Sequence, residues 1–247
     1  MAMKTQKILK WLDGILEPWK FDDVSNNGLQ IERSGDDIGK VAFAVDASVK
    51  SIRSAVEAGA QMLVVHHGIS WGGGIKYLSG EKYGVVKAAI DGNLALYASH
   101  LPLDANAKVG NNVHLAREFA LKGLKPAFSY HGNILGFTGT LESSAKLPKR
   151  GLAVRREFRE ALAATGKTKA LKIGVCSGGA GEFAVEAKAL GCDLYVTGEA
   201  SWADVIAAEN CGAAMVCLGH YETEVFGVRS LAGEMERALG IQTVDLT

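Results

Sequence analysis

Six side chains of types that commonly bind metal ions lie just after apolar runs of the sequence. They are His66, His67, His100, Asp104, His220 and Glu224. Imidazole and carboxylate groups together bind Zn, Fe, Mn, Ni or Co. A catalytic ion needs three protein ligands and an open position, so these donors suffice for two ions. The residue types therefore predict a metal centre, and a carboxylate that bridges two ions fits them well.

The spacing of these residues assigns each of them an expected role. The expected metal ligands are His66, His67, Asp104, His220 and Glu224. Glu224 is the expected bridge between two ions, and a bound water that loses a proton near neutral pH would be the nucleophile. His100 and Glu199 are expected either to orient a ligand or to act as a general acid or base.

Each residue also has a purely structural interpretation. A histidine beside an apolar run is often a hydrogen-bonded core residue, and His114 and His131 fit either this interpretation or that of a plain surface residue. Asp104 suits a turn or a helix start, and Glu224 suits the first turn of a helix. A doubled histidine and two His-x-x-x-acid units, all at the ends of strand-like runs, together favour the metal centre.

The elements that must position these residues alternate between strands and helices. Apolar runs such as 41–45 and 62–65 predict strands, and each precedes a segment of helical composition that ends near a glycine. Strands that are apolar throughout are buried on both faces, which is typical of an α/β sheet covered by helices. Functional side chains in such folds gather at the carboxyl ends of the strands.

An internal repeat indicates two similar lobes. Residues 41–68 align with 173–200, and residues 85–104 align with 205–224. The glycine-rich stretch 69–80 explains the change of spacing as an insertion in the first copy. Each copy ends in a His-x-x-x-acid unit, so a pseudo-twofold axis would make these units face each other across a cleft.

The predicted fold class is therefore α/β, with two similar lobes from the repeat and the metal site in the cleft between them. The expected lobes are residues 1–125 and 126–247, with terminal elements that can be exchanged. The segment 122–170 has no counterpart in the aligned repeat.

Three further features allow two interpretations each. Asp46 ends the first strand-like run, where it can hold a metal ligand or cap the helix that follows. Trp71 can stack on a ring-shaped substrate or anchor its loop. The glycine-rich segment 176–181 can hold a phosphate with its backbone amides or form a tight turn between a strand and a helix.

Composition limits the classes of function. The 247 residues carry 27 basic and 27 acidic side chains, so a strongly basic nucleic-acid binder is not indicated. We expect no membrane span, since there is no uninterrupted apolar run of the required length. None of the four cysteines has Cys-x-x-Cys spacing, and reduced thiols in a cytoplasmic protein are expected.

The motifs along the chain resemble those of the Nif-three-like family with a dinuclear metal centre, many members of which carry the name GTP cyclohydrolase 1 type 2. The matching motifs are Asn-Gly-Leu-Gln (27–30), Val-His-His-Gly-x-x-Trp (65–71), His-Leu-Pro-Leu-Asp (100–104), Gly-Asn-Asn (110–112), Cys-Ser-Gly-Gly-Ala-Gly (176–181), Thr-Gly-Glu (197–199) and Gly-His-x-x-x-Glu (219–224), with Gly227 and Arg229. The resemblance implies two α/β lobes, two metal ions in the cleft between them and a ring-like homohexamer. It implies the same five ligands as the spacing. Asn106 differs, because some members have a histidine there.

Two functions follow from these expectations. The first is a hydrolase that depends on two divalent metal ions per chain (Zn, Fe, Mn or Ni) and acts on a small nucleotide-like or phosphorylated substrate; the resemblance implies a GTP cyclohydrolase. The second is a metal-binding or regulatory oligomeric protein that acts through partners without catalysis.

Overall fold

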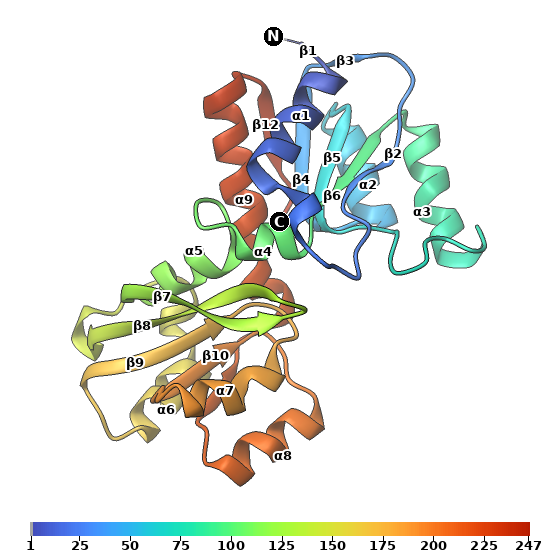
Figure 1. The fold of residues 1–247 in the computed structure, drawn as a ribbon. Helices are drawn as coiled ribbons and strands as arrows, with labels where there is room; N and C mark the ends of the chain where they lie inside the picture. The colour runs from blue at the N-terminus through green and yellow to red at the C-terminus, as the bar shows by residue number, and fades with distance from the viewer. Residues whose placement is uncertain (1) are drawn as a thin grey trace. The chain divides into compact units, whose positions relative to one another are not determined.

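The structure is a computed structural model that describes residues 2–247, and the chain divides into two compact units (Figure 1). The first unit comprises Met1–Gly110 and Gly227–Thr247, and the second comprises Asn111–Phe226. Each unit contains a five-stranded sheet with helices. The predicted α/β class is therefore confirmed, whereas the internal repeat and the lobe ranges stay predictions.

The first unit is built on a mostly parallel sheet of five strands, beside a small antiparallel pair, β1 and β3. The strands of the unit are β1 (Met3–Lys4), β2 (Gly28–Ile31), β3 (Asp37–Ile38), β4 (Lys40–Asp46), β5 (Met62–His67), β6 (Ala95–Ala98) and β12 (Gln242–Asp245). Its helices are α1 (Thr5–Leu16), the 3-10 helix Pro18–Lys20, α2 (Val49–Glu57), α3 (Gly80–Asp91), α4 (Leu101–Ala105) and the part of α9 (His220–Leu239) from Gly227 onward. The large sheet has the order β12-β4-β5-β6-β2, in which only β2 is antiparallel to its neighbour.

Helices cover both faces of this sheet, which explains why its central strands are apolar throughout. On one face, Leu63 of β5 packs in a buried cluster with Ile52 of α2 and Val85 of α3. On the other face, the buried Tyr97 of β6 donates a hydrogen bond of 2.8 Å to Asp13 of α1. The carboxyl ends of the parallel strands β4, β5 and β6 therefore meet at one edge of a fully covered sheet.

The second unit has a mixed sheet. Its strands are β7 (Lys122–Tyr130), β8 (Asn133–Ser143), β9 (Lys169–Cys176), β10 (Leu194–Thr197) and β11 (Met215–Cys217). Its helices are α5 (Asn111–Glu118), α6 (Arg156–Ala164), α7 (Ala184–Ala189), α8 (Trp202–Cys211) and the start of α9, with 3-10 turns at Ser144–Lys146, Gly151–Val154 and Gly181–Phe183. The order is β11-β10-β9-β8-β7, and only the pairs β9–β10 and β10–β11 are parallel.

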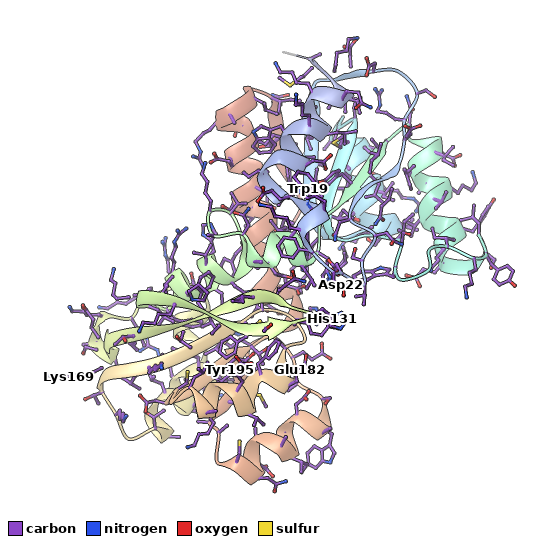
Figure 2. The ribbon with its side chains drawn as sticks, viewed as in Figure 1. Trp19, Asp22, His131, Lys169, Glu182 and Tyr195 are labelled. Atoms are coloured by element: carbon purple, nitrogen blue, oxygen red, sulfur yellow. The ribbon has the colours of Figure 1, made fainter. Side chains whose placement is uncertain are left out.

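Aromatic side chains fill the two faces of the second sheet. Phe119 and Phe158 stack with ring centroids 4.4 Å apart in the cluster that also holds α6. Elsewhere Phe128 packs edge-on against Tyr195, which Figure 2 labels, at 5.2 Å. Gly174 makes room for this pair, because a Cβ there would lie 2.7 Å from the Phe128 ring.

The described part of the chain contains no helix that is both long and apolar enough to cross a membrane. The 20-residue α9 carries charged side chains along its length, from Glu222 to Arg237.

We predict that Phe158→Ala lowers the free energy of unfolding of the second unit by about 3–5 kcal/mol, because it opens a cavity in a closely packed core. Tyr77→Ala is the control: the Tyr77 side chain is 82% exposed, and its loss should change stability by about 0.5 kcal/mol or less. Urea denaturation followed by circular dichroism measures both. Equal stabilities of the two variants would contradict the assigned core.

Candidate functional site

Three histidines of the first unit gather where two neighbouring parallel strands end. His66 and His67 are the last residues of β5, and His100 follows β6 after one further residue. Their ring nitrogens lie within 4.8 Å of one another, a group that could hold a metal ion. His66 is fully buried, and the other two side chains are each 19% exposed. The structure thus brings His100 together with two of the expected ligands.

Asp104 joins this group from the short helix α4. The helix begins directly after His100, with Pro102 in its first turn, where the fixed φ of proline suits a helix start. Asp104 is 6% exposed, and its Oδ2 lies 3.6 Å from Nε2 of His66. The first unit therefore supplies four donors of the metal-binding type.

Each of these three histidines is held through the same ring atom. Nδ1 of His66 lies 3.0 Å from the backbone oxygen of Ser99. Nδ1 of His67 lies 2.8 Å from Oδ1 of Asp46. Because a carbonyl and an ionised carboxylate only accept hydrogen bonds, Nδ1 must carry the proton and donate. This tautomer leaves the lone pair on Nε2, through which a neutral histidine can bind a metal ion.

His100 is held in the same way by Asp23, which the sequence analysis did not identify. Nδ1 of His100 lies 2.9 Å from Oδ1 of Asp23. The Asp23 carboxylate, 2% exposed, also accepts hydrogen bonds from the backbone of Ser25 and Leu101 and from Asn27. Burial on its own raises the pKa of this carboxyl, but the bonds from His100, Asn27 and Ser25 outweigh burial and lower the pKa below its usual value. Asp23 therefore stays ionised.

The segment that carries Asp23 also fixes the backbone around the histidines. Asn27 accepts a 2.8 Å hydrogen bond from the backbone of His100, and Gln30 accepts one of 2.7 Å from the backbone of Ile69. Trp71 donates from Nε1 to Gly68 and lies with its ring centroid 5.1 Å from that of His100. Asn27 and Gln30 belong to the Asn-Gly-Leu-Gln motif, so this motif positions the loops after β5 and β6.

Asp46 contacts His67 and does not cap α2. Asp46 and His67 are paired at the ends of the parallel strands β4 and β5, which places the two side chains side by side. The cap of α2 is Ser48, which accepts a hydrogen bond from the backbone of Ser51. Of the two interpretations of Asp46, the structure supports the one in which it orients a histidine.

The second unit holds His220 and Glu224 at the start of α9. Their spacing of four residues puts both on one side of the helix, and Nε2 of His220 lies 3.3 Å from Oε1 of Glu224. Nδ1 of His220 lies 2.9 Å from Oε2 of Glu199. The hydrogen bond with Glu224, followed by the contact with Glu199, raises the pKa of His220 to about 9. A metal ion that binds this imidazole must therefore displace a proton.

The glycine-rich segment 176–181 packs against this pair as a tight turn. Gly178 has a φ of +67°, and a Cβ there would lie 2.2 Å from Oε1 of Glu224, so only glycine fits. Its amide donates to Oγ1 of Thr223, and the amide of Ser177 donates to Asn112. Because protein groups already use these two amides, the turn interpretation is favoured over a phosphate cradle at this position.

His114 and His131, which the sequence does not favour as metal ligands, lie on other elements of the second unit. His114 is on α5, and His131 is in the turn between β7 and β8, where Figure 2 labels it. Among residues 2–247, neither histidine belongs to a group of three or more His, Cys, Asp or Glu side chains that could hold a metal ion.

Comparison with known proteins gives one consistent family. Residues 3–246 match the family model described as Duf34/NIF3 (NGG1p interacting factor 3). Proteins named GTP cyclohydrolase 1 type 2 homolog are 40% identical in Archaeoglobus fulgidus, over 99% of this chain and 98% of the relative, and 37% identical in Pyrococcus horikoshii, over 98% and 97%.

Solved structures agree with the sequence relatives. TTHA1606 from Thermus thermophilus is 31% identical with a TM-score of 0.77, over 99% of this chain and 98% of that one. Reduced HcgD from Methanocaldococcus jannaschii is 25% identical with a TM-score of 0.80, over 100% and 98%. The family model, the relatives and the shared fold lead to one conclusion: this chain belongs to the DUF34/NIF3 family.

Proposed function

We propose that the protein is a metal-dependent hydrolase with a dinuclear centre. The proposed ligands are His66, His67, His100, Asp104, His220 and Glu224. The observation that carries this proposal is the anchoring of the histidines: each of the four has Nδ1 bonded to a carboxylate or a carbonyl. A histidine that binds a metal ion through Nε2 has its Nδ1 held by an acceptor in this way, whereas a core histidine can be hydrogen-bonded through either ring nitrogen.

We propose further that both units contribute to the centre. The first unit supplies four donors, and the second supplies His220 and Glu224. Two donors are too few for an ion that needs three protein ligands, and four are too few for two such ions. Six donors are sufficient for two such ions, and we propose Glu224 as the carboxylate that bridges them.

His100 and Glu199 take different roles in this proposal. His100 is assigned as a ligand because its Nδ1 is held by Asp23 and its ring lies 5.1 Å from that of His66. Glu199 holds His220 through Oε2, and its side chain is 66% exposed, so it can also exchange a proton with a substrate. Glu199 is thus the proposed acid or base, while Asp23 and Asp46 are positioning residues.

The proposed substrate is a small nucleotide-like or phosphorylated molecule. When bound, a pair of divalent ions such as Zn, Fe, Mn or Ni supplies Lewis acidity and lowers the pKa of water. Trp71 lies beside His67 and His100 and offers an aromatic surface to a ring-shaped substrate. The name of the curated relatives, GTP cyclohydrolase 1 type 2 homolog, supports a purine nucleotide as the first candidate.

A metal-binding or regulatory role without catalysis is the second candidate. The family description refers to an interacting factor, and the two amides of the glycine-rich turn discussed above are already used by protein groups. A homohexamer in the cytoplasm belongs to both proposals. The hexamer rests on the family resemblance, and the cytoplasm is supported by the reduced thiols that we expect for the four cysteines.

We predict that the protein, purified without added metal or chelator, contains about two transition-metal ions per chain. His67→Ala and Glu224→Ala should each lose metal, whereas His131→Ala should retain it. Elemental analysis and titration with Zn, Mn, Fe and Ni measure the content. A wild-type protein that is empty and takes up none of these ions would contradict the proposed centre.

The same preparations distinguish the two candidate functions. Metal-loaded wild type is screened for turnover of nucleotides and phosphoesters, with Glu199→Gln as the test of the proposed acid or base. Turnover that falls in Glu199→Gln at unchanged metal content supports the hydrolase. A loaded protein without turnover of any of these compounds would favour the non-catalytic role.

We also predict that Asp46→Ala weakens metal binding about 10- to 100-fold, because His67 loses the group that fixes its tautomer. Asp91→Ala is a matched control: the Asp46 and Asp91 side chains are 55% and 60% exposed, and Asp91 makes a surface ion pair with Lys87. Calorimetric titration of metal-free protein measures both affinities. Equal affinities of the two variants would show that the anchor is dispensable.

A further inference from the structure

A cavity lies in the first unit, and none of the candidate metal ligands lines it. Its volume is about 470 Å³, which suits a small organic ligand. The residues that define its chemistry are Asp13, Trp19, Phe21, Asp23, Leu29 and Tyr97. They come from α1, from the segment 17–28 and from strands β2 and β6.

An exposed tryptophan forms part of the cavity wall. Trp19, labelled in Figure 2, belongs to the 3-10 helix after α1, and its side chain is 66% exposed. Glu17, just before it, has a left-handed backbone with a φ of 49°, and Pro18 restricts the next φ. The chain thus holds a large aromatic ring in water through a conformation that is rare for glutamate. Such exposed aromatic rings are typical of binding surfaces.

The charge of the cavity is negative. Two of its lining residues are aspartates, and none of those that the structure describes is basic. The Asp23 carboxylate already accepts hydrogen bonds from His100 and from three other donors. The carboxylate of Asp13 accepts only the hydroxyl of Tyr97, and no Lys, Arg or His side chain in the described part of the chain forms an ion pair with it. Asp13 is therefore the group that a ligand can neutralise.

We propose that this cavity binds a flat aromatic cation that carries N–H donors, such as an amidinium or a protonated amino-heterocycle. The ring would lie against Trp19, where the aromatic face favours a positive charge, and the N–H groups would donate to Asp13. Phe21 and Leu29 supply apolar walls. This site is additional to the proposed metal centre and does not depend on it.

The cavity and the histidine group share Asp23. A ligand in the cavity contacts the residue that accepts the hydrogen bond from Nδ1 of His100. Binding in the cavity and binding of metal would therefore act on the same side chain. Tests of the cavity need metal-free protein, so that failure of the metal proposal cannot be mistaken for failure of this one.

The test is a titration of the metal-free full chain with para-aminobenzamidine, in which the fluorescence of this probe measures binding. We expect saturable binding that weakens about tenfold or more in Asp13→Asn and in Trp19→Ala, in line with the loss of one charged hydrogen bond or one stacking contact. The neutral analogue para-aminobenzamide should also bind about tenfold more weakly.

Trp202→Ala is the matched control, since Trp202 is another exposed tryptophan, at 76%, in the second unit. It should bind the probe as the wild type does. Trp19→Ala removes an exposed side chain, so this variant should keep its fold. Circular dichroism checks the fold of Trp19→Ala and of Trp202→Ala. Absence of saturable binding to the wild type, equal binding of the amide, or unchanged affinity in Asp13→Asn and Trp19→Ala would each overturn the proposal.

Discussion

The hydrogen bond at Nδ1 of each histidine is the interaction on which the account of this site depends. An imidazole without such a bond exchanges its proton between two nitrogens and rotates about its side-chain torsions, and either motion turns a ligand away from an ion. Here a backbone carbonyl fixes His66, and carboxylates fix His67, His100 and His220. The fold places each of these acceptors within hydrogen-bond distance of its histidine.

Two features of the scaffold make this possible in the first unit. Parallel strands β4, β5 and β6 end at one edge, so Asp46 reaches His67 through the ordinary register of the sheet. His100 has no acidic neighbour in that register, and its acceptor comes from the loop before β2. Burying the Asp23 carboxylate is costly, and its hydrogen bonds to His100, Ser25, Asn27 and Leu101 offset that cost. In the second unit, glycine at position 178 leaves the space that Glu224 occupies.

The sequence was sufficient to predict the class of the fold and most of the candidate donors. Apolar strands followed by His66, His67 and His100 are local patterns, and sheets of this class place such residues at one edge. The sequence also suggested Asp46 as a partner of a metal ligand, because Asp46 ends the strand-like run before the one that ends in His67. The choice between binding a histidine and capping α2 needed the structure, which gives the cap to Ser48.

Long-range partners could not be predicted in this way. Asp23 and Asn27 meet His100 from more than 70 residues away, and no local periodicity relates them. Strand β12 pairs with β4, so Gln242 lies opposite Lys40, although the sequence suggests only that terminal elements can be exchanged. The amides of the segment 176–181 looked available in the sequence, whereas Asn112 and Thr223 bind two of them in the structure. Each case depends on tertiary contacts between distant segments.

The protonation state of the histidines tests the central claim most directly. Long-range proton–nitrogen correlation spectra of metal-free protein with labelled histidine distinguish the two neutral tautomers, and single histidine variants assign the signals. The account predicts that His66, His67 and His100 carry the proton on Nδ1 and that Nε2 shifts when a divalent ion is added. A proton on Nε2 of these residues, or tautomers in rapid exchange, would contradict it.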